Sequence, residues 1–305
     1  MPCYHPLQAY QDSNSGGKLL FKLPRRSSRY ISYSPIKVAC GRCIGCRLDR
    51  SRDWAVRCVH EAQMHEDNCF ITLTYNPESL PADRSLSHRD FQLFMKRFRK
   101  KFGSGIRYFM AGEYGANLHR PHYHACIFGF DFPDKELFKV RDDFRLYTSQ
   151  ILEDLWGLGF CTVGDVSFES AAYVARYITK KINGKDASDH YYWVDDATGE
   201  CFSLKPEYCR PSTRGGIGKA WFDRFYSDVY PIDHVVLRGV EMRPPRYYDK
   251  LFERKFPDVF ADLKLSRVLN RLELDIDDSP ERLLVKEKVK LSQFNQLIRS
   301  LEYDT

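Results

Sequence analysis

The most constraining feature of this 305-residue chain is a stretch in which three of six residues are histidine, followed by an apolar run from Ala125 to Phe130. The stretch reads His119-Arg120-Pro121-His122-Tyr123-His124. The run favours a strand, and alternate side chains of a strand share a face. His122 and His124 are therefore expected to point the same way, and two neutral imidazoles on one face can bind a divalent metal ion. A hydrogen-bonded strand face without metal is the competing interpretation.

A second feature is the segment from Tyr173 to Lys181, which contains no proline or glycine and is expected to form a helix. Tyr173 and Tyr177 then lie one above the other, because residues four apart share a helix face. A phenol is a poor nucleophile at neutral pH because its pKa is near ~10. A metal that polarises the electrophile, together with a nearby cation such as Lys180, could activate it. The alternative is that the tyrosines belong to the core and the lysines to the surface.

Together these segments resemble the replication-initiator endonucleases of the His-hydrophobic-His (HUH) superfamily. Within that group the chain is similar to the initiators of small single-stranded DNA phages of the microvirus and gokushovirus type. The resemblance extends over most of the chain. Four segments carry it: Phe70–Tyr75, Arg120–His124, Tyr173–Lys181 and a cysteine cluster at Cys40–Arg47.

The resemblance implies an α+β fold with a central antiparallel sheet, related to RRM and ferredoxin-like folds and flanked by helices. The histidine strand is expected to be central, with the tyrosine helix beside it. The pattern itself favours such a sheet over a parallel doubly wound one. Strands are predicted at 69–75, 106–113, 121–130 and 160–166, helices near 53–64, 87–102, 147–156, 167–182 and 219–226, and a long polar loop at 183–218.

A third metal ligand is implied by the same resemblance, as an acidic or polar residue from the neighbouring strand. Residues 106–113 predict that strand and 114–120 a turn back, so Glu113 is expected beside His122 or His124. An exposed carboxylate in a salt bridge is the alternative for Glu113. Ligand chemistry alone permits zinc. Carboxylate, water and phosphate oxygens suit Mg²⁺ or Mn²⁺, and these are the ions that the family implies.

The implied function is nicking of single-stranded or supercoiled viral origin DNA. One tyrosine attacks phosphorus, displaces a 3′-hydroxyl and becomes linked to the 5′-phosphate, which leaves a primer for rolling-circle replication. A second tyrosine would cut again and rejoin strands. No ATPase motif is found, so duplex unwinding would need a separate helicase, and the resemblance implies a host helicase and polymerase as partners. Two other classes stay open: a zinc-dependent DNA- or RNA-binding regulator without catalysis, and a metal phosphodiesterase that uses water.

Basic residues are clumped although the net charge is only +6. Local basic clusters often contact the phosphates of a nucleic-acid backbone, whereas a solvated charged face is the ordinary alternative. The predicted DNA contacts are Arg97, Lys100 and Lys101 in the helix at 87–102, together with Arg120 and Lys181.

Three of the ten cysteines, Cys40, Cys43 and Cys46, have C-x₂-C-x₂-C spacing, and Cys3 is the predicted fourth ligand. A Cys₄ zinc site would stabilise an N-terminal segment that is too small for its own core. An iron–sulfur cluster and free thiols are the alternatives. The start of the chain lacks an apolar signal segment, and no run approaches the ~20 apolar residues of a membrane span. We therefore expect an intracellular protein, whose thiols stay reduced, and the resemblance to phage initiators implies the cytoplasm of a bacterial host.

Three regions follow from this organisation: a cysteine-rich segment at 1–50, the endonuclease domain at 51–235 and a helical C-terminal region at 236–305. In the last region Leu284, Leu291 and Ile298 repeat every seven residues. The repeat is too short for a coiled coil, so this stripe is expected to pack on the protein's own body. The oligomeric state stays open.

Overall fold

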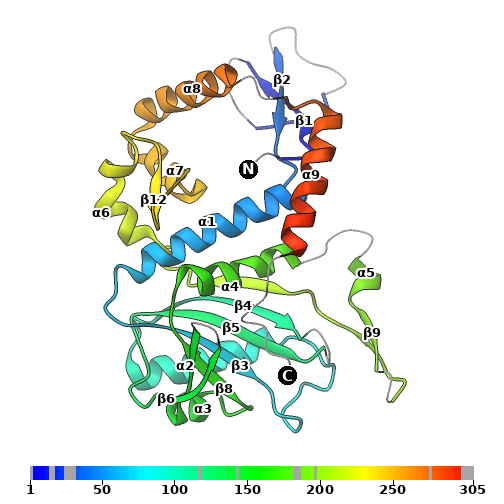
Figure 1. The fold of residues 1–305 in the computed structure, drawn as a ribbon, viewed down its shortest axis with the longest axis vertical. Helices are drawn as coiled ribbons and strands as arrows, with labels where there is room; N and C mark the ends of the chain where they lie inside the picture. Colours follow the sequence, from blue (N-terminus) through cyan, green and yellow to red (C-terminus); the bar gives the residue numbers. More distant parts are fainter. Residues whose placement is uncertain are drawn as a thin grey trace. The chain divides into compact units, whose positions relative to one another are not determined.

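The computed structural model describes residues 3–13, 18–23, 32–115, 119–141, 144–180, 187–195, 198–274 and 277–296 (Figure 1). The chain divides into two compact units. The first unit takes residues 1–50 and 268–298, and the second takes residues 51–267.

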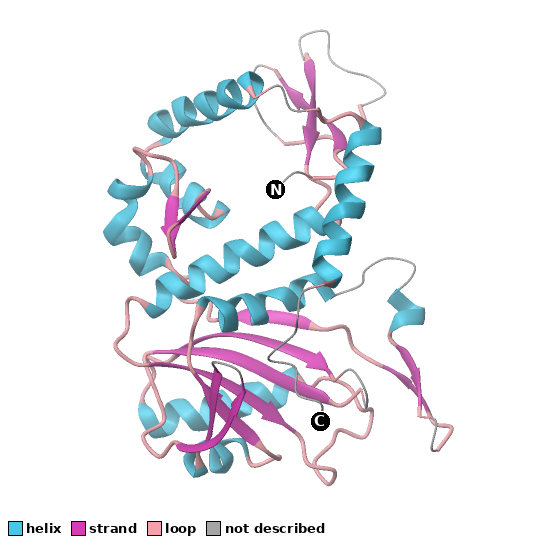
Figure 2. Ribbon diagram, viewed as in Figure 1, coloured by secondary structure: helices cyan, strands magenta, loops and turns pink. Residues whose placement is uncertain are grey.

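Strands and helices are distributed over both units (Figure 2). The strands are β1 Leu7–Asp12, β2 Tyr33–Val38, β3 Asn68–Thr74, β4 Arg107–Tyr114, β5 Pro121–Phe128, β6 Glu136–Arg141, β7 Phe144–Thr148, β8 Cys161–Gly164, β9 Tyr192–Val194, β10 Cys201–Ser203, β11 Tyr208–Pro211, β12 Val235–Leu237 and β13 Val240–Met242. The helices are α1 Ile44–Ala62, α2 His88–Phe102, α3 Gln150–Trp156, α4 Phe168–Lys180, α5 Ala187–His190, α6 Lys219–Val229, α7 Arg246–Lys255, α8 Pro257–Glu273 and α9 Pro280–Asn295. None of the helices in the described ranges combines the length and the apolar character that crossing a bilayer requires.

The second unit is organised around a seven-stranded sheet in the order β11-β4-β5-β3-β8-β7-β6. All its paired neighbours are antiparallel. The expected α+β fold with an antiparallel sheet flanked by helices is thus confirmed. Apart from the β6–β7 pair, which is inserted between β5 and α3, the elements β3, α2, β4, β5, α3 and β8 follow one another as β-α-β-β-α-β, the succession of ferredoxin-like sheets. The histidine strand β5 lies inside the sheet, between β4 and β3.

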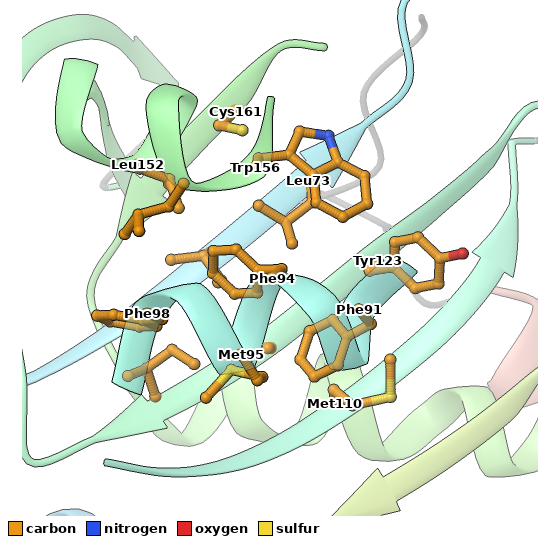
Figure 3. Close-up of a cluster of buried hydrophobic side chains, with 14 of the residues drawn as sticks. Leu73, Phe91, Phe94, Met95, Phe98, Met110, Tyr123, Leu152, Trp156 and Cys161 are labelled. Carbon is orange, nitrogen blue, oxygen red and sulfur yellow. The ribbon is translucent and has the colours of Figure 1, made fainter. Parts of the chain in front are cut away.

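One face of the sheet is covered by α2 and α3 (Figure 3). Leu73, Met110 and Tyr123 project from β3, β4 and β5 into this layer. Helix α2 meets them with an apolar stripe at i, i+3, i+4 and i+7, the spacing that places side chains on one helix face. The stripe consists of Phe91, Phe94, Met95 and Phe98, all buried.

The opposite face packs against α4 and the second half of α1. Because strand side chains alternate, it carries the residues between those of the first face, including Phe70, Ala111 and Cys126. Val174 of α4 and Cys58 of α1 close this layer. The even-numbered positions of β5, including His122 and His124, therefore belong to the α4 side.

Two sequence-based expectations for the second unit were wrong. Residues 183–218, predicted as a loop, contain the β9–β10 hairpin, and their strand β11 pairs with β4 at the sheet edge. These strands have three or four residues, which is too short for a periodic signal. The helix predicted from Tyr147 begins instead at Gln150, because the Ser149 side chain accepts a hydrogen bond from the Leu152 amide.

The first unit contains a β1–β2 ribbon that precedes the cysteine cluster. Its small core joins Tyr4, Cys43 and Ile44 to Leu283 of α9. The leucine stripe of α9 does not pack as expected, because Leu284 is 51% exposed and Leu291 is 38% exposed. Leu283 and Phe294 face the core instead, and Ile298 lies outside the described residues.

Candidate active site

Three side chains converge on the α4 side of the sheet from the adjacent strands β4 and β5. Glu113 is paired with His122, and Ala111 with His124, in the antiparallel register. Directly opposite residues project to the same face, so the Glu113 carboxylate reaches both rings. Its Oε1 atom lies 2.8 Å from Nε2 of His122 and 2.9 Å from Nε2 of His124. One ligand atom from each residue lies within 4.8 Å of the others.

The outer ring nitrogens have partners that fix the orientation of both imidazoles. Nδ1 of His122 lies 3.1 Å from the carbonyl oxygen of Arg120, and Nδ1 of His124 lies 3.0 Å from the Thr72 hydroxyl. The Phe70 ring stacks on His124 with centroids 5.6 Å apart. Nε2 of each histidine is consequently directed at the shared centre, as in metal sites where the second nitrogen is held by a neighbouring group.

Glu113 is a buried carboxylate whose environment keeps it ionised. Its side chain is 2% exposed, and this burial acts to raise its pKa. The charges and hydrogen bonds of His122 and His124 outweigh burial and hold the pKa of Glu113 well below its usual range. A carboxylate oxygen and two imidazole nitrogens, close together and already oriented, suit a divalent cation.

Helix α4 brings Tyr173 to this centre. The ring centroids of Tyr173 and His124 are 5.1 Å apart, with the planes at 85°. Tyr173 also meets Phe70 edge-on at 6.4 Å, and the residue is only 4% exposed. The side chains of Tyr177 and Lys180, and the whole of Lys181, lie outside the described residues.

The predicted DNA contacts are not gathered in one place. Arg120 adjoins the centre through its carbonyl, and its guanidinium donates to the carbonyl oxygen of Tyr75 at 3.3 Å. Arg97 donates to the carbonyl oxygens of Leu155 and Trp156 at the end of α3. Lys100 and Lys101 are exposed on α2, which covers the other face of the sheet. Contact of these α2 residues with DNA stays a prediction.

Thr72 and Phe70 are site residues that sequence reasoning did not single out. Both lie on β3, where Thr72 is paired with His124. Their segment had contributed only to the family resemblance. Because they alternate along one strand, Phe70 and Thr72 share a face. This identifies them as site residues only once β3 is known to lie beside β5, and that pairing brings together Thr72 and His124, which are 52 positions apart.

The four cysteines form a second group of possible metal ligands, in the first unit. Sγ of Cys40 lies 4.0 Å from Sγ of Cys46, and Sγ of Cys43 lies 3.9 Å from Sγ of Cys3. Burial acts to raise the pKa of Cys40, but hydrogen bonds from the amides of Cys43 and Arg42 outweigh it and lower that pKa to about 7. Four sulfurs held tetrahedrally at about 2.3 Å from one ion lie about 3.8 Å apart, so the group fits a single ion.

Replacing Thr72 by valine is expected to weaken binding of Mn²⁺ by about 10- to 100-fold, the usual effect of losing a group that orients a metal-binding histidine. Valine keeps the shape of the side chain but loses the hydroxyl that meets Nδ1 of His124. Calorimetric titration with Mn²⁺ measures the effect. The matched control is Thr162→Val, which changes the residue paired with Thr72 on β8 and should bind Mn²⁺ normally. Equal losses in the two variants would contradict an orienting role for Thr72.

Comparison with known proteins places these features in a family. A family model described as "Replication-associated protein ORF2/G2P" matches residues 68–182, which include Glu113, His122, His124 and Tyr173. The chain is 33% identical over 284 residues to replication-associated protein VP4 of Bdellovibrio phage phiMH2K, a match that covers 90% of this chain and 84% of the relative. It is 32% identical over 280 residues to replication-associated protein ORF2 of Spiroplasma virus 4, covering 85% and 83%. For ORF4 of Chlamydia phage 1 the identity is 30% over 226 residues, covering 70% and 53%. No solved structure matches the chain. The chain therefore belongs to the family of replication-associated proteins found in these bacterial viruses.

Proposed function

We propose that this protein initiates rolling-circle replication of a single-stranded phage genome by nicking the viral origin with a tyrosine. The observation that carries the proposal is the edge-on contact between the Tyr173 ring and His124, at a centre shared with Glu113 and His122. The family of replication-associated proteins supports the biological role. A nucleophile beside three convergent metal ligands supports the chemistry.

Glu113, His122 and His124 are the residues that would hold the cation. When bound there, Mg²⁺ or Mn²⁺ supplies Lewis-acid polarisation of a phosphate oxygen. The Thr72 hydroxyl and the Arg120 carbonyl keep both imidazoles oriented. Phe70 and Tyr173 pack around His124 and exclude water from that side.

The proposed reaction exchanges one phosphodiester for another. The phenolic oxygen of a tyrosine bonds to phosphorus as the bond between phosphorus and the 3′-oxygen breaks. The phenol releases its proton, and the departing 3′-oxygen ends as a hydroxyl, so atoms and charge balance. The products are a 5′-phosphotyrosine and a free 3′ end. We assign the nick to Tyr173, a second transfer to Tyr177, and stabilisation of the phenolate to Lys180.

The cysteine group is proposed to bind zinc. The sulfur separations of 3.9 and 4.0 Å fit one tetrahedral ion. They do not suit an iron–sulfur cluster, because the four cysteines of a cluster are divided among two or four iron atoms, and sulfurs bound to different irons must lie further apart than the 4.8 Å that encloses this group. The core of the first unit is small, so an ion at this place would supply a large part of its stability.

Replacing Cys43 by serine is accordingly expected to remove one zinc ion per chain and to open the first unit. Structural zinc contributes about 10 kcal/mol or more to the folding of small domains, and Cys43 lies in the same buried cluster as Tyr4 and Ile44. Elemental analysis measures the zinc, and limited proteolysis measures the opening. Cys201→Ser is the control, because Cys201 is an exposed thiol. An unchanged zinc content in Cys43→Ser would exclude the site.

The proposed substrate is the origin strand in single-stranded or supercoiled viral DNA, with Arg120 near the scissile phosphate. We also propose that the protein works in the bacterial cytoplasm with a host helicase and polymerase, which would unwind the duplex and extend the free 3′ end.

One experiment separates the nicking enzyme from its alternatives. The protein is incubated with Mn²⁺ and origin oligonucleotides labelled at either end, and the products are resolved on a denaturing gel. The proposal predicts a protein band that carries label only from the fragment on the 3′ side of the nick. Cleavage without a labelled protein would indicate a phosphodiesterase that uses water. Binding without cleavage would indicate a regulator.

A further inference from the structure

Formal charge is divided unequally between the two units. The first unit, residues 1–50 and 268–298, contains 14 basic and 8 acidic residues, whereas the rest of the chain contains 33 of each. The whole net charge of +6 therefore belongs to the smaller unit. A zinc ion held by four thiolates would add two negative charges, and a clear positive excess would remain. Such an excess attracts polyanions.

The excess is concentrated at the surface of the N-terminal part. Five cationic side chains there are exposed, and none forms an ion pair with a carboxylate of the described residues. They are Lys18, Lys22, Lys37, Arg42 and Arg50. Two carboxylates of the C-terminal part of this unit have other partners: Asp278, just before α9, pairs with Arg271, and Glu287 of α9 pairs with His5.

Local structure gathers these cations around the ribbon. Lys37 of β2 is paired with Gln8 of β1, and both are exposed. On the other side of β1, Leu20 exchanges two backbone hydrogen bonds with Tyr10 and so brings the segment with Lys18 and Lys22 alongside. β2 leads through the cysteine cluster into α1, so the metal-binding turn connects the ribbon to Arg42 and Arg50.

Two features favour duplex DNA as the polyanion that binds these cations. Proteins that bind single strands combine cations with several aromatic platforms, but Phe21 is the only exposed aromatic side chain among the described residues of this unit. A two-stranded antiparallel ribbon fits the major groove of B-DNA, and Lys and Gln side chains pair there with base edges.

We propose that the first unit carries a second DNA-binding surface, which holds the phosphate backbone of duplex DNA through Lys18, Lys22, Lys37, Arg42 and Arg50. This inference goes beyond the proposed nicking activity, because it concerns a different surface and a double-stranded ligand. Duplex binding does not require cleavage, so an experiment can contradict the duplex-binding proposal without contradicting the nicking proposal, and the reverse.

The test compares binding of the full-length protein to fluorescent duplex and single-stranded oligonucleotides that lack the origin, over a series of salt concentrations. The variant is Lys18→Gln/Lys22→Gln/Lys37→Gln. Each lost phosphate contact reduces the slope of log K against log[salt] by about 0.9 for duplex DNA, so the slope should become shallower by about 2.7. Affinity for the duplex should fall about 100-fold near 0.15 M salt. Adduct formation with a single-stranded origin oligonucleotide should be unaffected.

A matched triple variant in the second unit, Arg224→Gln/Lys250→Gln/Arg254→Gln, removes three exposed cations and should leave the duplex slope unchanged. A second variant, Arg42→Gln/Arg50→Gln, changes no residue of the ribbon, so its result is informative even if the first variant misfolds. It should reduce the slope by about 1.8. An unchanged slope in this second variant, or in a folded first variant, would overturn the proposal. So would a loss of single-strand binding as large as the loss of duplex binding.

Discussion

The variant Tyr173→Phe/Tyr177→Phe is expected to form no covalent adduct with DNA, and its strand cleavage should fall by at least about 1000-fold. The substitution removes both phenolic oxygens and keeps both rings. In particular, phenylalanine at position 173 can keep the contacts with Phe70 and His124. The loss would therefore reflect chemistry rather than misfolding. A denaturing gel with an end-labelled origin oligonucleotide and Mn²⁺ measures both adduct and cleavage.

Single variants separate the two tyrosines. Tyr173→Phe should abolish the first nick, because Tyr173 is the tyrosine whose ring lies against His124. Tyr177→Phe should still form the first adduct and lose the second transfer, which joins strands. Tyr192→Phe, at a residue 56% exposed on β9, is the control and should behave as wild type. An adduct that persists in Tyr173→Phe and disappears in Tyr177→Phe would reverse the assignment, and persistence in the double variant would exclude tyrosine chemistry.

Local patterns predicted much of the sheet and its centre. The alternation through His122 and His124 placed both side chains on one face, as in β5. The short return between β4 and β5 predicted Glu113 beside them, because a hairpin fixes which residues are opposite. Helix α2 was predictable from apolar residues at helical spacing. In each case the signal lies within about twenty residues of the chain.

What the sequence could not supply depends on distant contacts. The role of Thr72 needs the pairing of β3 with β5, across a connection that contains α2 and β4. Lys100 and Lys101 were expected to contact DNA. The apolar pattern of α2 predicts a helix, but it does not predict which face of the sheet that helix covers. In α9 both Leu283 and Leu284 fit an apolar face, and only contact with Tyr4 and Ile44 selects Leu283.

Glu113→Gln should lower the affinity for Mn²⁺ by more than about 100-fold, since losing a ligand costs more than losing a group that only orients one. Glutamine keeps the size of the side chain but lacks the charge that the two histidines hold in the ionised form. Adduct formation should fall accordingly at low Mn²⁺ and recover as the concentration is raised. The measurement is the rate of adduct formation as a function of Mn²⁺ concentration.

The shape of that curve decides what Glu113 does. If the carboxylate only binds the ion, the half-saturating concentration of Mn²⁺ rises and the maximal rate stays near wild type. A lower maximal rate at an unchanged half-saturating concentration would mean that Glu113 acts on the substrate instead. Glu207→Gln is the matched control: Glu207 is another buried carboxylate, next to β11, and it accepts a hydrogen bond from the Tyr191 hydroxyl rather than meeting an imidazole. Its curve should therefore coincide with that of the wild type, because no histidine at the centre depends on its charge.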